Sequence, residues 1–144
     1  MKSVRIIVGC LVLLALWGCG QQRERVADEV MQQAQTEYNS GVACLKGDSL
    51  MEALPHFFEV ANRLEKLPED MTNEEMLLAS KACYQMANVF GAKMEHNAEI
   101  DALHQALGFQ TAIHDTTWMI RSSLQLASAL EIIQENDSAS FYLN

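Results

Sequence analysis

The chain has 144 residues, a formal net charge of −9 and an apolar content of 49%. This length predicts one domain, and its two prolines and seven glycines are too few for a disordered chain. The charge argues against nucleic-acid binding, because an acidic surface repels phosphates. Removing residues 1–18 takes away Lys2 and Arg5 and no acid, so the remainder carries −9 minus 2, or −11.

Residues 1–18 have the pattern of an export signal. Lys2 and Arg5 precede the apolar run 6–17, whose 12 residues are too few to span a bilayer. The run ends in Leu-Trp-Gly-Cys, which resembles the lipobox of bacterial lipoproteins. This resemblance implies cleavage before Cys19 and lipidation of Cys19, with several acyl chains giving a stable anchor. An ordinary cleaved signal or a short anchor helix is the alternative.

The segment after the signal indicates where the protein resides. Residues 19–24 are expected to form a lipidated tether, and residues 25–144 a helical repeat domain. No acid directly follows Cys19, so by the same resemblance the retention signal for the inner membrane is missing. We therefore expect a protein of the bacterial cell envelope, anchored by lipid in the outer membrane and facing the periplasm.

Apolar residues recur in steps of three and four from residue 26 to residue 64, which predicts two amphipathic helices. Their stripes are Val26, Val30, Ala34, Tyr38, Val42 and Leu45, then Leu50, Ala53, Leu54, Phe57, Ala61 and Leu64. A turn is expected at Gly47-Asp48, with Asp48 as the N-cap of the second helix. Gly41 lies inside the first helix at a cost of about 1 kcal/mol relative to alanine, so close packing of a second helix is expected there.

Four more helices are predicted after the break at residues 67–70. Thr72 and Glu75 form a capping-box pattern at the start of the third helix. The stripes of the third, fourth and fifth helices are Leu78, Ala82, Met86, Val89 and Phe90; Ile100, Leu103, Ala106, Leu107 and Ile113; and Met119, Leu126, Ala127, Leu130 and Ile133. A turn is expected over 91–97 and another at 136–137, with a sixth helix from about Ser138.

Gly41, Ala53 and Phe57 are spaced as a small, a small and an aromatic residue across a helix–turn–helix unit. The spacing resembles the tetratricopeptide repeat (TPR), which has such residues at its eighth, twentieth and twenty-fourth positions in a unit of about 34 residues. Ala87 and Ala127 then take the eighth position of two further units. The resemblance implies an all-α, TPR-like helical-hairpin solenoid with about two complete repeats and a truncated third. Another array of α-hairpins is the alternative.

The TPR resemblance also implies a peptide-binding groove lined by the first helix of each unit. On this alignment its residues are Gln35, Tyr38, Lys81, Tyr84, Asn88, Arg121 and Ser128. Lys81, Arg121 and Asn88 would hold a peptide carboxylate through charge-assisted hydrogen bonds. Tyr38 and Tyr84 would flank an apolar side chain. A solvated polar groove, or tyrosines that belong to the core, is the alternative.

The four cysteines are expected to have different roles. Cys10 lies in the signal, and Cys19 carries lipid. Cys44 and Cys83 lie among apolar neighbours in predicted helices and are expected as buried free thiols. A disulfide between them is the alternative, which requires Cα atoms within about 7 Å.

No motif of catalysis or metal binding is present in the sequence. The chain has no HExxH, GxSxG, P-loop or GxGxxG pattern. We therefore expect no enzyme, catalytic residue, metal or cofactor. The expected function is that of a lipid-anchored scaffold or adaptor that binds a protein or peptide and no nucleic acid. The alternatives are the sensory N-terminal portion of a truncated TPR-containing signalling or transcriptional regulator, and a small enzyme or metal carrier.

Overall fold

The computed structural model describes residues 26–65 and 71–143, with side-chain surroundings up to residue 134. The first helix spans 26–46, and α2 (Leu50–Glu65), α3 (Asn73–Ala92), α4 (His96–Ala112) and α5 (Thr116–Leu143) follow it. Every regular element in these two ranges is helical. The prediction of an all-α fold is therefore confirmed. The signal, the tether and Cys19 lie outside the described residues.

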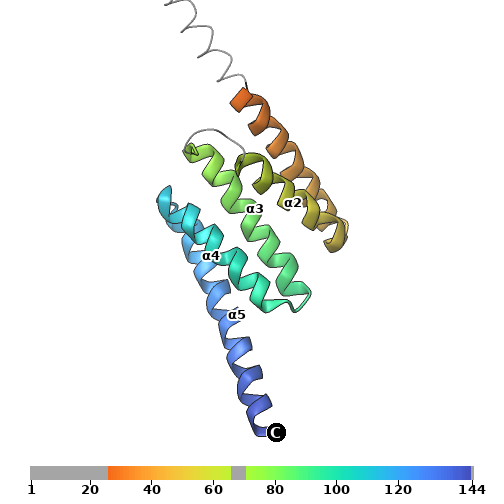
Figure 1. Ribbon diagram of the computed structural model, residues 1–144, viewed down its shortest axis with the longest axis vertical. Helices are drawn as coiled ribbons and strands as arrows, with labels where there is room; N and C mark the ends of the chain where they lie inside the picture. The colour runs from red at the N-terminus through yellow and green to blue at the C-terminus, as the bar shows by residue number, and fades with distance from the viewer. Residues whose placement is uncertain (1–25, 66–70, 144) are drawn as a thin grey trace, which may run out of the picture.

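The helices pack in chain order as antiparallel hairpins. α2 lies against α3, α3 against α4, and α4 against α5, while the C-terminal half of α5 extends past the other helices (Figure 1). Between 26 and 65, and between 71 and 143, no helix combines the length and apolar character that a membrane crossing requires.

Three turns between helices share one backbone conformation. Asp48, Met94 and His114 have φ angles of 59°, 60° and 56°. In each turn the next residue donates its amide, over 2.9 Å, to the carbonyl five residues earlier. This bond belongs to the Schellman motif, which closes the C-terminal end of a helix. The turn expected at Gly47-Asp48 is confirmed.

The N-cap of α2 differs from the prediction. Asp48 adopts the left-handed conformation that ends the first helix, so its assignment as the N-cap is wrong. The carbonyl of Ser49 accepts the first bonds of α2, from the amides of Glu52 at 3.1 Å and Ala53 at 3.0 Å. Aspartate is compatible with both positions, because it tolerates positive φ and also caps helices.

The first hairpin is centred on the contact between Gly41 and Phe57. A Cβ atom at Gly41 would lie only 2.7 Å from Cε1 of Phe57. Phe57 is completely buried, and the ring of Tyr38 packs on it with centroids 5.8 Å apart. The close approach predicted at Gly41 is therefore present. α2 continues through Pro55 without interruption.

The second hairpin contributes most of the core. The amide of Glu75 donates to Oγ1 of Thr72, and the amide of Thr72 donates to Oε2 of Glu75, which confirms the capping box. The predicted turn over 91–97 is shorter, because α3 continues to Ala92 and α4 begins at His96. The buried apolar residues of α3 and α4 are Leu78, Ala79, Ala82, Cys83, Met86, Ala87, Val89, Ala102, Leu103 and Ala106.

The C-terminal helix corrects three predictions. α5 is continuous to Leu143, so the turn at 136–137 and the sixth helix are wrong. No glycine or proline occurs between 116 and 143, and one Asn-Asp pair costs too little helix propensity to end a helix. The alignment that gave Ala127 a packing role is also wrong, because Ala127 is exposed. Between residues 116 and 134 of α5, the buried small residues are Ser122 and Ala129, which lie two turns apart.

One buried amide in α4 leads to a stability prediction. Gln110 is completely buried, and neither its Nε2 nor its Oε1 has a hydrogen-bond partner within the described ranges. Gln110→Leu should therefore raise the free energy of unfolding by about 1–2 kcal/mol, since an unpaired buried polar group is costly. Urea denaturation measures the change. Gln32→Leu, at an exposed position of the first helix, should change it by less than about 0.5 kcal/mol. A clear loss of stability in Gln110→Leu would contradict this prediction.

Candidate functional site

An aromatic pair joins α3 to α5. The rings of Tyr84 and Trp118 meet edge to face, with centroids 5.1 Å apart. The guanidinium of Arg121 lies 5.2 Å from the centroid of the Trp118 ring. Such a cation–π contact orients the guanidinium beside the aromatic pair. Two predicted groove residues, Tyr84 and Arg121, are therefore brought together through Trp118.

Two cations flank this aromatic pair. α3 and α5 run in the same direction, because the chain reverses twice between them. Lys81 precedes Tyr84 by one turn on α3, and Arg121 follows Trp118 by one turn on α5. Within the part of the chain that the structure describes, neither cation pairs with a carboxylate. We call this region the α3–α5 surface; its residues are Lys81, Tyr84 and Asn88 on α3 and Trp118, Arg121, Leu124, Gln125 and Ser128 on α5.

A hollow of about 220 Å³ lies between the C-terminal end of α3, the first turn of α4 and the middle of α5. Its lining comes from three helices: Asn88, Gly91 and Ala92 of α3, His96 and Glu99 of α4, and Gln125, Ser128, Ala129 and Ile132 of α5. Asn88 and Ser128, both predicted as groove residues, thus share one site. We call it the Glu99 hollow.

The carboxylate of Glu99 links all three helices of the hollow. Its side chain is only 7% exposed. Oε2 lies 2.9 Å from Nδ1 of His96, and Oε1 accepts a hydrogen bond of 2.8 Å from Nε2 of Gln125. No lysine or arginine of the described segments lies within ion-pair distance of it. This buried charge is therefore held by hydrogen bonds and one histidine.

Gly91 explains how this carboxylate fits between the helices. A Cβ atom at residue 91 would lie 2.8 Å from Oε1 of Glu99. The TPR alignment places Glu99 at a position where a small residue is usual. In this hairpin the small residue is on α3 instead, and the larger side chain comes from α4.

The remaining predicted groove residues lie elsewhere. Gln35 is exposed on the first helix and donates to Oδ1 of Asn39 at 3.1 Å. Tyr38 is half-buried against Phe57 and belongs to the core of the first hairpin. Neither residue lines the Glu99 hollow. Of the two tyrosines expected to flank an apolar side chain, Tyr84 is the one on the α3–α5 surface.

The sequence patterns do not single out four residues of the site, which are His96, Glu99, Trp118 and Gln125. A signal for two of them exists. Trp118 follows Tyr84 by 34 residues, and Gln125 follows Gly91 by the same interval. This interval equals the usual TPR length. Pairing α3 with α5 at this offset would have placed Trp118 beside Tyr84 and Gln125 in the same region as Gly91.

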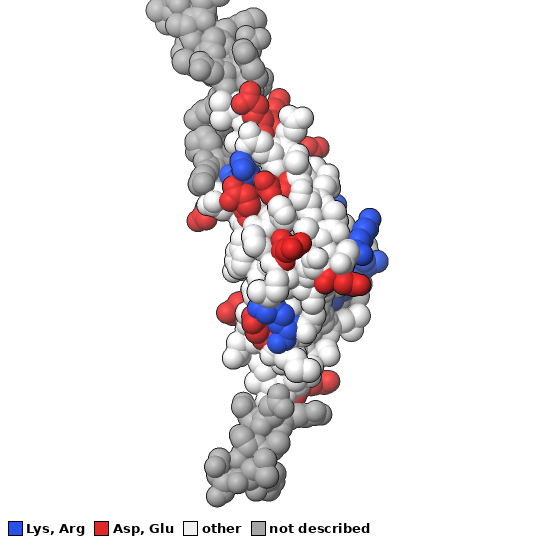
Figure 2. Space-filling view, turned by 90° about the vertical axis from the view of Figure 1, so that its right-hand side faces the viewer, with Lys and Arg blue, Asp and Glu red and all other residues white. Residues whose placement is uncertain are grey.

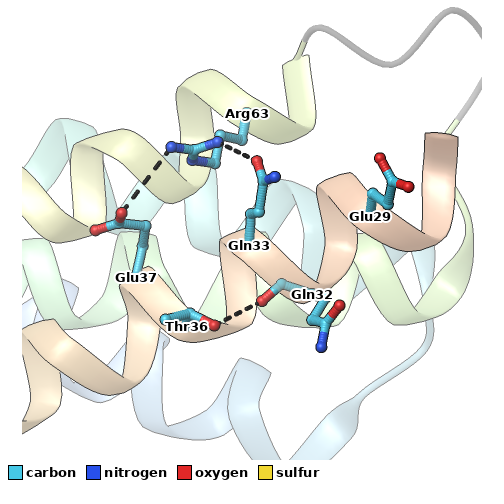
Figure 3. Close-up of a pocket in the computed structure, with 6 residues that line it drawn as sticks. All are labelled: Glu29, Gln32, Gln33, Thr36, Glu37 and Arg63. Atoms are coloured by element: carbon cyan, nitrogen blue, oxygen red, sulfur yellow. Dashed lines mark hydrogen bonds and ion pairs between the residues drawn. The ribbon is translucent and has the colours of Figure 1, made fainter.

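The first hairpin has a separate polar cluster (Figure 3). Arg63 of α2 reaches Gln33 and Glu37 of the first helix and also pairs with Glu59 at 3.0 Å. His56 of α2 lies 2.8 Å from Glu37. The side chains bind one another, so the cluster ties α2 to the first helix. Partly exposed pairs of this kind contribute about 0–1 kcal/mol each.

The two cysteines of the described segments are free thiols. Cys44 is half-buried and Cys83 is buried, so the expectation of a buried thiol is confirmed fully only for Cys83. Desolvation by burial raises the pKa of Cys83 to about 11. A thiol that stays protonated at neutral pH is a poor nucleophile. It acts here as a small core side chain whose thiol donates to Oε1 of Gln105 at 3.8 Å.

In the described segments, neither metal-ligating nor acidic side chains gather into a second candidate site. In residues 26–65 and 71–143, no three His, Cys, Asp or Glu side chains are grouped as a metal site would need. Acidic side chains are scattered over the face shown in Figure 2 and do not form one patch.

Comparison with protein-family models, with curated proteins and with solved structures gave no match to this chain. Its function is therefore inferred from its own residues and geometry.

Proposed function

We propose that this protein is a lipid-anchored, TPR-like scaffold of the bacterial envelope that binds a protein or peptide on the α3–α5 surface. The observation that carries the proposal is the Tyr84–Trp118 pair flanked by two cations that have no carboxylate partner in the described segments. The lipid anchor at Cys19 and the position in the outer membrane facing the periplasm rest on the lipobox resemblance alone.

The TPR-like architecture is supported by packing at equivalent positions. Gly41 and Phe57 are in contact and lie 16 residues apart. Ala87 and Leu103 have the same separation in the second hairpin, and both are completely buried. The three turns of identical backbone conformation add to this regularity. These features are what a stack of similar helical hairpins requires.

The chemistry of the α3–α5 surface favours an acidic peptide. Lys81 and Arg121 supply donors for charge-assisted hydrogen bonds to a carboxylate. Leu124, 68% exposed and one turn after Arg121, offers an apolar contact next to the aromatic pair. Because the whole chain is acidic, with a charge of −9, these two cations would attract a negatively charged segment to this place in particular.

A charge-reversal variant tests this proposal. Lys81→Glu combined with Arg121→Glu should weaken capture of immobilised acidic peptides by the full chain in detergent at least about tenfold, because two attractive charges become repulsive. Lys46→Glu combined with Lys93→Glu has the same net charge and alters two helix ends outside the α3–α5 surface, at the cost of one partly exposed ion pair between Lys93 and Glu95. This control should bind as the wild type does. Unchanged capture by the Lys81/Arg121 variant would refute the proposed site.

A further inference from the structure

We infer that the Glu99 hollow binds a primary ammonium group, such as the side chain of a lysine in a peptide held on the α3–α5 surface. The identity of the peptide as the source of this group rests on the proposed function. The ammonium site itself rests on the hydrogen bonding inside the hollow.

The hollow presents several acceptors, and one N–H donor of each amide in its lining is already engaged. Nε2 of Gln125 donates to Glu99, which leaves the carbonyl oxygen of Gln125 as an acceptor. Nδ2 of Asn88 donates to Oε1 of Gln85 at 3.0 Å, which leaves its carbonyl oxygen in the same way. Ser128 adds an exposed hydroxyl at the rim. An ammonium group has three donors and no acceptor, so it matches this set.

The charge of the hollow also favours an ammonium group. Each oxygen of Glu99 has one hydrogen-bond partner, whereas a carboxylate can accept about four hydrogen bonds in total. Its neighbour His96 is the one titratable base in the lining, and no lysine or arginine contributes to it. A buried carboxylate in this setting attracts a cation and repels an anion.

The walls of the hollow suit the aliphatic part of a lysine. Ala92, Ala129 and Ile132 line it together with the polar groups. Lysine packs its methylene chain on apolar surface while its ammonium group finds polar partners. The hollow, at about 220 Å³, has room for such a chain. A divalent metal is a poor fit, because Glu99 is its single carboxylate and metal sites need several converging ligands.

The test uses n-butylammonium and n-butanol, which share a carbon chain and differ in charge. NMR of the full chain in detergent should show saturable shifts of the Gln125 side-chain amide and the Gly91 backbone amide with n-butylammonium, at a Kd on the order of millimolar. Glu99→Gln should weaken this binding about tenfold or more. Glu95→Gln, at an exposed carboxylate before α4, should leave it unchanged. Equal shifts with n-butanol, or no shifts with n-butylammonium, would overturn the inference.

A second variant avoids disturbing the buried carboxylate. Ser128→Lys places an ammonium group at the exposed rim, where it should occupy the hollow and block n-butylammonium. Free access of the probe in this variant would count against the site. Peptides with lysine and with acetyl-lysine separate the two proposals. If both are captured equally and n-butylammonium does not bind, the ammonium site is refuted and peptide binding stands. If no peptide binds but n-butylammonium does, the proposed function is refuted and the ammonium site stands.

Discussion

Gly41→Leu is expected to lower the free energy of unfolding by about 3 kcal/mol, near the upper end for overpacked cores. The first carbon of any side chain at this position would lie 2.7 Å from the ring of Phe57. That ring is completely buried against Tyr38, so it cannot move aside without displacing the first helix from α2. Thermal or urea denaturation followed by circular dichroism measures the loss.

Gly108→Leu is the matched control. Gly108 lies inside α4, and a Cβ atom there would have no neighbour within 4 Å. Replacing this glycine removes its entropic cost, so the free energy of unfolding is expected to rise by about 0.5–1 kcal/mol.

A double-mutant cycle tests the contact between Gly41 and Phe57 directly. Phe57→Leu should recover part of the stability lost in Gly41→Ala, because the smaller side chain leaves room for the added Cβ atom. Equal effects of leucine at residues 41 and 108 would show that Gly41 is not a packing residue.

The sequence was most informative where one helix face is buried by its own hairpin. Ala53, Phe57 and Leu64 were placed in one stripe, and all three are buried. The capping box at Thr72 was also recognised, because its two hydrogen bonds form within one turn and depend little on the rest of the fold. Local rules therefore predicted the elements and most of the core of α2 and α3.

The sequence was least informative for α5, where polarity and burial disagree. Ser122 is completely buried, whereas Leu124 is 68% exposed and Leu130 is 48% exposed. A prediction from hydrophobicity alone would bury the two leucines and expose the serine. Which face of α5 is covered depends on how α4 packs against it, and a periodic pattern does not contain that information. The TPR alignment paired Ala87 with Ala127, an offset of 40 residues between α3 and α5, whereas the contact between Tyr84 and Trp118 corresponds to an offset of 34.

The same register error limited prediction of the candidate site. The residues on α3 were assigned to the correct helix, but their partners on α5 depend on the offset between the two helices. With the shifted register Trp118 and Gln125 had no assigned contact. The TPR alignment places Glu99 at a position where a small residue is usual, and it assigns no contact to it. Its role in joining α3 to α5 follows from Gly91 and Gln125, which are close to it only in the folded chain.

The stability of this protein should fall between about pH 9 and pH 11 through the thiol of Cys83. Burial raises the pKa of this group from 9.0 to about 11 in the folded chain. Above pH 9 the unfolded chain loses the proton while the folded chain keeps it, so rising pH favours unfolding. The stabilisation by the Cys83 thiol is fully present below the pKa of this group in the unfolded chain, and it is lost as pH approaches its pKa in the folded chain. Two pKa units correspond to about 3 kcal/mol.

Cys83→Ala isolates this effect from the other groups that titrate in alkali. At neutral pH the free energy of unfolding of the variant should be about 1–3 kcal/mol lower than that of the wild type, because alanine fills less of the core. With rising pH, however, it should fall less steeply than that of the wild type. The difference in free energy of unfolding between wild type and variant, measured by urea denaturation from roughly pH 8 to roughly pH 11, should change by about 3 kcal/mol. Parallel curves for wild type and Cys83→Ala would show that the buried thiol does not control alkaline stability.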